Sequence, residues 1–303
     1  MHQLFTIPEL LTNIIANTEK MASCLLVNRN WFVITAPVVW SDPFHISSPK
    51  LFHMLVSSFL IDSDYSDCQP ALYTILKKQK KFSPEKLTLP YLKYLNVLDY
   101  SGLIRAINQF INQYKELGEE QQETIQQQLT TSILKMLERN VMLKSLKVQE
   151  WNGSLDEDIY LSLFKFSNFI SGIEELELGS DFTKVKFLTS LSNICHGITV
   201  MALNLASRNI TEDLGKAEIM AVKKLIQSQT NLTVESFQII SREAYGNNLK
   251  LFLLPALQAN TWKSFYIDID NSILHLLKDE NSYTVTQTGS EPLLDWLLCN
   301  KNL

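Results

Sequence analysis

Six short segments of the chain share one spacing of apolar residues, and this spacing constrains the fold more than any other feature. In each segment two residues separate the first apolar residue from the second, and one residue separates the second from the third. The segments span residues 92–97, 143–148, 173–178, 200–205, 234–239 and 262–267. In the second and fifth segments the other positions are polar with a period of two, which favours a β-strand over a helix. We therefore expect six strands.

The central apolar residues of these segments recur at nearly regular intervals. They are Leu95, Leu146, Leu176, Leu203, Phe237 and Phe265, and the last four intervals are 30, 27, 34 and 28 residues. The first interval, 51 residues, predicts an insertion or a further repeat that the pattern misses. Because 46% of the residues are hydrophobic, the spacing alone also arises by chance at about thirty positions. The residues between the segments must therefore show whether the six segments are strands of a repeat.

Each later gap carries the signals of an amphipathic helix. The capping residues Ser154, Thr183, Thr211 and Asn248 each precede apolar residues at helical spacing. Gly197 predicts the end of the second of these helices, and Pro255 predicts a kink in the last. Strand followed by helix at a near-constant period predicts an α/β solenoid of parallel strands over residues 91–303. In this interpretation residues 290–303 close the solenoid as a C-terminal cap. An array of two-helix repeats is the alternative.

One face of the predicted sheet is polar and mixed in charge. Alternation along the strands puts Lys147, Glu177, Asn204, Gln238 and Tyr266 on that concave face, flanked by Ser145, Glu175, Ala202, Ser236 and Ser264. Such a surface fits an unidentified target protein better than a nucleic acid. A plain solvated sheet face is the alternative interpretation.

The first 44 residues have a different character. Thr6 and Glu9 form a capping box around Pro8, so a helix should begin near Ile7. Three apolar groups follow, namely Leu10, Leu11, Ile14 and Ile15, then Met21, Cys24, Leu25 and Val27, then Trp31, Phe32, Ile34 and Val38. We expect three short amphipathic helices, the third ending at Pro37. A unit this small buries too little surface to be robust alone, which favours a partner.

This stretch resembles the F-box in the order and spacing of its residues. The matching pieces are Ile7-Pro8-Glu9-Leu10-Leu11, Ile14-Ile15, the run from Ser23 to Arg29, Trp31, Ala36-Pro37 and Trp40. The resemblance implies that the segment docks on a Skp-type adaptor, and through it on a cullin. It assigns that contact to Pro8, Leu10, Leu11, Ile14, Leu25, Val27 and Trp31. For Trp31 and Ile15 a place in the internal core of the three helices is the other interpretation.

The later repeats are similar to degenerate leucine-rich repeats, whose periods are about 20–29 residues, so the whole chain resembles fungal proteins that join an F-box to such repeats. The implied domains are an F-box at 1–45, a helical linker region at 46–90 and the repeat solenoid at 91–303. The implied function is substrate recognition for a Skp/cullin ubiquitin ligase. A leucine-rich scaffold with capping N-terminal helices, or an F-box protein outside ubiquitination, remains an alternative.

The other sequence features do not favour catalysis, cofactor binding, nucleic-acid binding or membrane insertion. The chain has no GxSxG, P-loop, HExxH or GxGxxG motif. Its four cysteines are scattered without metal-ligand spacing, and the net charge of −5 offers no basic face for nucleic acid. No apolar run approaches the ~20 residues of a membrane span, and no signal peptide is visible. We expect a non-catalytic, cofactor-free protein of the cytoplasm or nucleus.

Overall fold

A computed structural model describes residues 10, 13, 15, 21–24, 27–44, 52, 92–113, 118–148, 160–179, 185–204, 212–229, 232–239, 262–269, 272–278 and 283–288. The chain divides into two compact units, residues 1–143 and 144–303. Several predictions lie outside the described residues. These are the capping box at Thr6, the helices of the 46–90 linker apart from Phe52, the caps Ser154, Thr183 and Thr211, the helix after Asn248 with Pro255, and the cap at 290–303.

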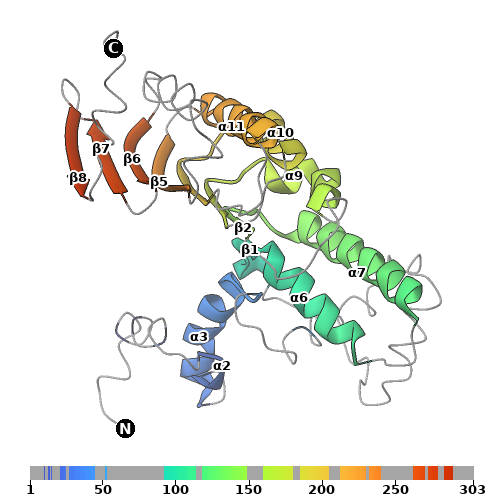
Figure 1. Cartoon of the computed structure of the whole chain (residues 1–303). Helices are drawn as coiled ribbons and strands as arrows, with labels where there is room; N and C mark the ends of the chain where they lie inside the picture. Colours follow the sequence, from blue (N-terminus) through green and yellow to red (C-terminus); the bar gives the residue numbers. More distant parts are fainter. Residues whose placement is uncertain are drawn as a thin grey trace. The chain divides into compact units, whose positions relative to one another are not determined.

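The described part of the first unit includes two of the three expected helices, α2 (Met21–Cys24) and α3 (Arg29–Ser41) (Figure 1). Asn28 caps α3, because its side-chain oxygen accepts a hydrogen bond from the backbone N–H of Trp31 at 3.0 Å. The predicted end at Pro37 is wrong, since α3 continues for four residues to Ser41. Pro37 has no N–H group to donate to the carbonyl of Val33, four residues earlier. Val33 is exposed, so a water molecule can donate to that carbonyl instead.

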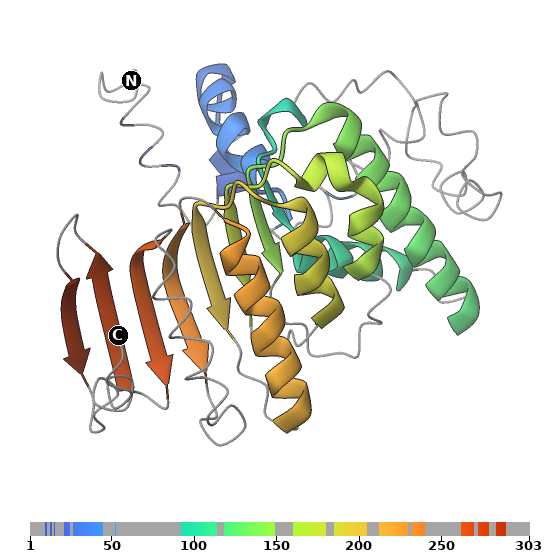
Figure 2. The same cartoon turned by 90° about the horizontal axis from the view of Figure 1, so that it is seen from above.

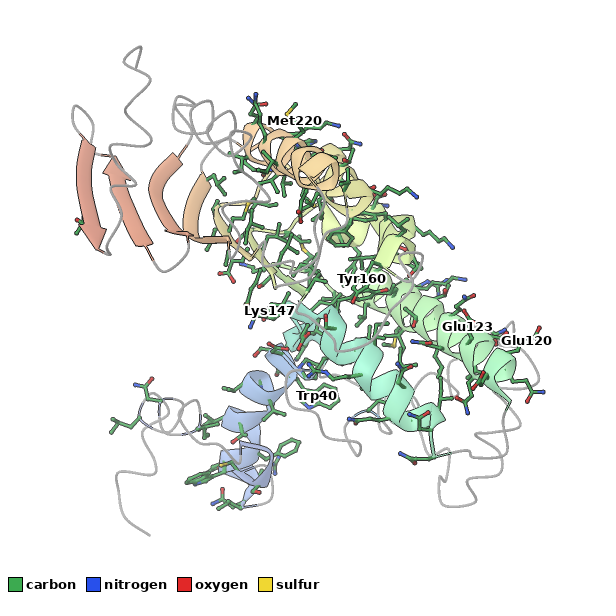
Figure 3. All side chains as sticks on the ribbon, in the orientation of Figure 1. Trp40, Glu120, Glu123, Lys147, Tyr160 and Met220 are labelled. Carbon is green, nitrogen blue, oxygen red and sulfur yellow. The ribbon has the colours of Figure 1, made fainter. Side chains whose placement is uncertain are left out.

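Two helices fill the long interval after the first predicted strand. They are α6 (Tyr100–Ile111) and α7 (Glu119–Asn140), preceded by a 3-10 turn at Leu92–Tyr94 and strand β1 (Val97–Asp99). In α6 the residues Leu103, Ile104, Ile107, Phe110 and Ile111 are all buried, and α6 packs against α7. Glu119 and Glu120 occupy the first turn of α7, where carboxylates complement the helix dipole. Figure 3 labels Glu120.

The second unit alternates parallel strands with helices, as expected for an α/β protein. Its strands β2 (Ser145–Val148), β3 (Glu175–Leu178), β4 (Val200–Asn204), β5 (Leu232–Ile239) and β6 (Trp262–Ile269) pair in sequence order, each parallel to the next. Within the described residues its helices are a 3-10 turn at Ser162–Phe166, α9 (Ser167–Ile170), α10 (Val185–Ile194) and α11 (Glu212–Gln227). Figure 2 shows α9, α10 and α11 side by side along one side of these strands.

The last two strands depart from the predicted parallel arrangement. Strand β7 (Ser272–Lys278) pairs antiparallel with β6, and β8 (Tyr283–Thr288) pairs antiparallel with β7. Only residues 270 and 271 join β6 to β7, whereas a parallel connection needs a crossover of a dozen or more residues. The short connection therefore forces a hairpin.

Two of the predicted segments are displaced along the sequence. In the first, Leu92–Tyr94 forms the 3-10 turn and the strand lies at Val97–Asp99, with Leu98 buried at its centre. In the fourth, Met201 pairs with Leu176, and Leu203 pairs with Leu178. The repeating spacing there runs from Ile198 to Leu203, two residues earlier than predicted. Both regions hold extra apolar residues, so the same apolar spacing can be placed at two different starting residues, which we call two frames.

Side chains just after two helices, α10 and α11, join successive helix-to-strand turns of the second unit. The thiol of Cys195, just after α10, donates to the carbonyl of Ile170 at the end of α9 at 3.2 Å. The buried side chain of Gln229, after α11, donates from Nε2 to the carbonyl of Cys195 at 2.7 Å and accepts at Oε1 from the N–H of Ile198 at 2.9 Å. Each helix-to-strand turn is therefore tied to the next one.

The backbone forms a second ladder where the strands begin. The carbonyl of Lys144 accepts hydrogen bonds from the N–H groups of Glu174 and Glu175, and the carbonyl of Glu174 accepts from Thr199 and Val200. These residues hold equivalent places before β2, β3 and β4. The second unit thus repeats its backbone hydrogen bonding from one strand–helix element to the next.

Candidate interaction surfaces

A small apolar core holds the N-terminal helices together. Ile15 and Cys24 are buried, and Trp31, Ile34 and Val38 pack against them partly buried. Trp31 therefore contributes to this core, and Ile15 does so fully. The internal interpretation of these two residues fits their burial, although Trp31 keeps part of its surface exposed.

Three large aliphatic side chains near this core remain exposed. The exposed fractions are 42% for Leu10, 56% for Val27 and 62% for Val33. Leu10 and Val27 belong to the predicted adaptor contact, whereas Val33 does not. Val33 shares its face of α3 with exposed Arg29 and Asn30, and an apolar residue on such a polar face is the signal that could have identified it. We call Leu10, Val27 and Val33 the N-terminal apolar surface.

The other predicted adaptor-contact residues are not described by the structure. Pro8, Leu11, Ile14 and Leu25 lie outside the described residues. Their assignment to the contact stays a prediction.

The five residues predicted on the concave face are only partly in register with one another. Lys147 and Glu177 are register partners and half-buried. Glu177 pairs next with Ala202, and Ala202 pairs with Ser236. Asn204 and Gln238 pair with each other, one step further along the strands, and Gln238 pairs with Asp268. Tyr266 pairs with His275 of β7.

The misalignment follows from the displaced frame of β4. Asn204 was expected beside Glu177, but the earlier frame brings Ala202 there instead. The five predicted target-binding residues therefore lie in two rows, and their role in binding stays a prediction. Figure 3 labels Lys147, which lies on β2.

Burial raises the pKa of the Cys195 thiol from 9.0 to about 12. The raised pKa makes the thiol a poor nucleophile, because the thiolate is the reactive form. We expect iodoacetamide at pH 8.5 to leave Cys195 unmodified in the folded protein and to modify it fully in 6 M guanidinium chloride. Mass spectrometry of the Cys195 peptide measures this, and rapid modification under native conditions would contradict the burial.

The same shift has a consequence for stability at high pH. A thiol whose pKa is raised on folding stabilises the folded state fully below the unfolded pKa, and the contribution is lost as pH rises from 9 toward 12. The Cys195→Ala variant should therefore lose less stability than the wild type over that range. The two proteins differ only at this side chain, so the comparison isolates the thiol.

Within the described residues, no group of three or more His, Cys, Asp and Glu side chains is arranged to hold a metal ion. Among the helices in the described part of the chain, none combines the length and the apolar character that a membrane crossing requires. No family model, curated protein or solved structure matches the chain.

Proposed function

We propose that the chain is an F-box protein with degenerate leucine-rich repeats, acting as a substrate-recognition adaptor of a Skp/cullin ubiquitin ligase. The N-terminal apolar surface would bind the Skp-type adaptor, and the second unit would bind a target protein. The chain itself would perform no chemistry, because holding a target beside an activated ubiquitin raises the effective concentration of the reacting groups.

The single observation that carries the proposal is the exposure of Leu10, Val27 and Val33 in a segment whose described core is formed by other residues. Ile15 and Cys24 are buried in that core, and Trp31 packs against them. Large exposed aliphatic residues grouped on one small unit are typical of protein-binding sites. Leu10 and Val27 also belong to the pieces that resemble the F-box, and that resemblance names a specific partner.

The solenoid is supported by the repeated architecture of the second unit. Parallel strands alternate with helices, and two hydrogen-bond ladders connect successive elements. In a solenoid each repeat contacts only its neighbours and one sheet face stays available for partners. On that face Lys147 and Glu177 would meet the target.

The double variant Val27→Asp/Val33→Asp tests the adaptor contact. Both side chains are exposed, so the fold should be retained while a buried carboxylate at the interface weakens binding about 30-fold or more. Isothermal titration of the purified chain with a purified Skp-type adaptor measures the change. Met220→Asp is the matched control, because Met220 is a 55% exposed residue on α11 and should leave the affinity unchanged.

The titration can also reject the proposal. If the wild-type chain does not bind the adaptor, or if the double variant binds as tightly as the control, the N-terminal helices have no adaptor function. The remaining candidate would then be a leucine-rich scaffold whose N-terminal helices cap the first strand. One observation favours it, namely the hydrogen bond from the N–H of Asn96 to the carbonyl of Ser41.

A further inference from the structure

The first turn of α6 contains a glycine that touches the chain following α3. A Cβ atom on Gly102 would lie 2.6 Å from the carbonyl oxygen of Phe44 and 2.7 Å from the Oδ2 atom of Asp99. Side-chain carbons essentially never approach other heavy atoms below 3.0 Å. Glycine is therefore required here for space and not for an unusual backbone conformation.

The neighbouring carboxylate cannot easily move aside to admit a larger residue. Asp99 is buried, and its Oδ1 atom accepts a hydrogen bond from the N–H of Gly102 at 2.7 Å, which caps α6. Its Oδ2 atom lies 3.5 Å from a guanidinium nitrogen of Arg105. Moving the carboxylate would break the cap and weaken the ion pair, leaving a buried charge poorly compensated.

The partner of Gly102 is equally constrained. Phe44 and Trp40 are buried, and the contact atom of Phe44 belongs to the backbone. Just before it, the carbonyl of Ser41 accepts the hydrogen bond from Asn96 at 3.2 Å, directly ahead of β1. The end of α3 is therefore held at two points, Asn96 and Gly102, by residues more than fifty positions later in the sequence.

We infer that α3, β1 and α6 form one rigid joint, and that Gly102 is the residue that allows it to close. The N-terminal helices are then a fixed extension of the first strand–helix element and do not pivot on it. The inference does not depend on adaptor binding. Should the proposed function hold, the joint would fix the adaptor-binding helix relative to the element from which the repeats continue.

Hydrogen exchange in the wild-type protein provides the first test. Under native conditions with increasing urea, amides at 38–44 and 92–98 should exchange through one opening event, with the same opening equilibrium and the same urea dependence. Mass spectrometry of the corresponding peptides measures this. Different openings for the two segments would overturn the inference without any variant.

The Gly102→Ala variant provides the second test. The added methyl group should force the joint open, so that exchange at 38–44 and 92–98 accelerates together by tenfold or more while β3 and α10 keep their protection. Gly118→Ala is the matched control, because a Cβ atom on Gly118 would meet no other atom within 4 Å, and it should leave both segments unchanged. Unchanged exchange in Gly102→Ala, or equal acceleration in Gly118→Ala, would overturn the inference.

Discussion

Replacing Gln229 with methionine should lower the free energy of unfolding of the second unit by about 2–4 kcal/mol. Methionine has nearly the same length and shape, so the loss comes from hydrogen bonds and not from a cavity. The buried carbonyl of Cys195 loses its donor at 2.7 Å, and the N–H of Ile198 loses its acceptor at 2.9 Å. Each buried group left without a partner costs about 1–3 kcal/mol.

Native-state hydrogen exchange in urea measures this effect at the amides of β3, β4 and α10. Gln227→Met is the matched control, because Gln227 ends the same helix α11 with an exposed side chain. The control should change the free energy of unfolding by less than about 0.5 kcal/mol. Equal effects of the two substitutions would show that the amide of Gln229 does not hold the turns together.

Strands β2 and β3 could be predicted from the sequence because their apolar pattern reflects burial, whereas β7 and β8 were not among the predicted strands. Leu146 and Val148 are buried while Lys147 between them is half-buried, and the same alternation recurs at Leu176, Glu177 and Leu178. A period of two with a buried face is a local property of each segment. No long-range information is needed to see it.

Registers between strands could not be predicted in the same way. Around β4 the apolar residues Ile198, Val200, Met201 and Leu203 permit two frames, and only pairing with Leu176 and Leu178 selects one. The selected frame also lets the N–H of Ile198 reach Gln229, 31 residues later. Such tertiary contacts decide between frames that local patterns leave equal.

The candidate adaptor surface also combines features that the local sequence reveals with features that only tertiary packing reveals. The sequence pointed to Leu10 and Val27 because they lie in the segment that resembles an F-box, and both are exposed. Val33 was not identified because its neighbours Trp31, Phe32 and Ile34 form an apolar run, which obscures the polar face that Val33 shares with Arg29 and Asn30. The core formed by Ile15 and Cys24 shows which of these side chains face inward. The close approach of Gly102 to Phe44 has no local signature at all.

Truncating Phe187 to alanine should destabilise the second unit by about 3–5 kcal/mol, because a fully buried ring is replaced by a cavity. The ring centroid of Phe187 lies 4.9 Å from that of Phe164 and 6.4 Å from that of Tyr160, so both aromatic contacts are lost as well. Figure 3 shows Tyr160 beside the helices of this unit. Exchange at α10 and β3 amides in urea measures the loss. Phe187→Leu keeps most of the volume and should cost clearly less, and equal small effects of both variants would place Phe187 outside the stabilising core.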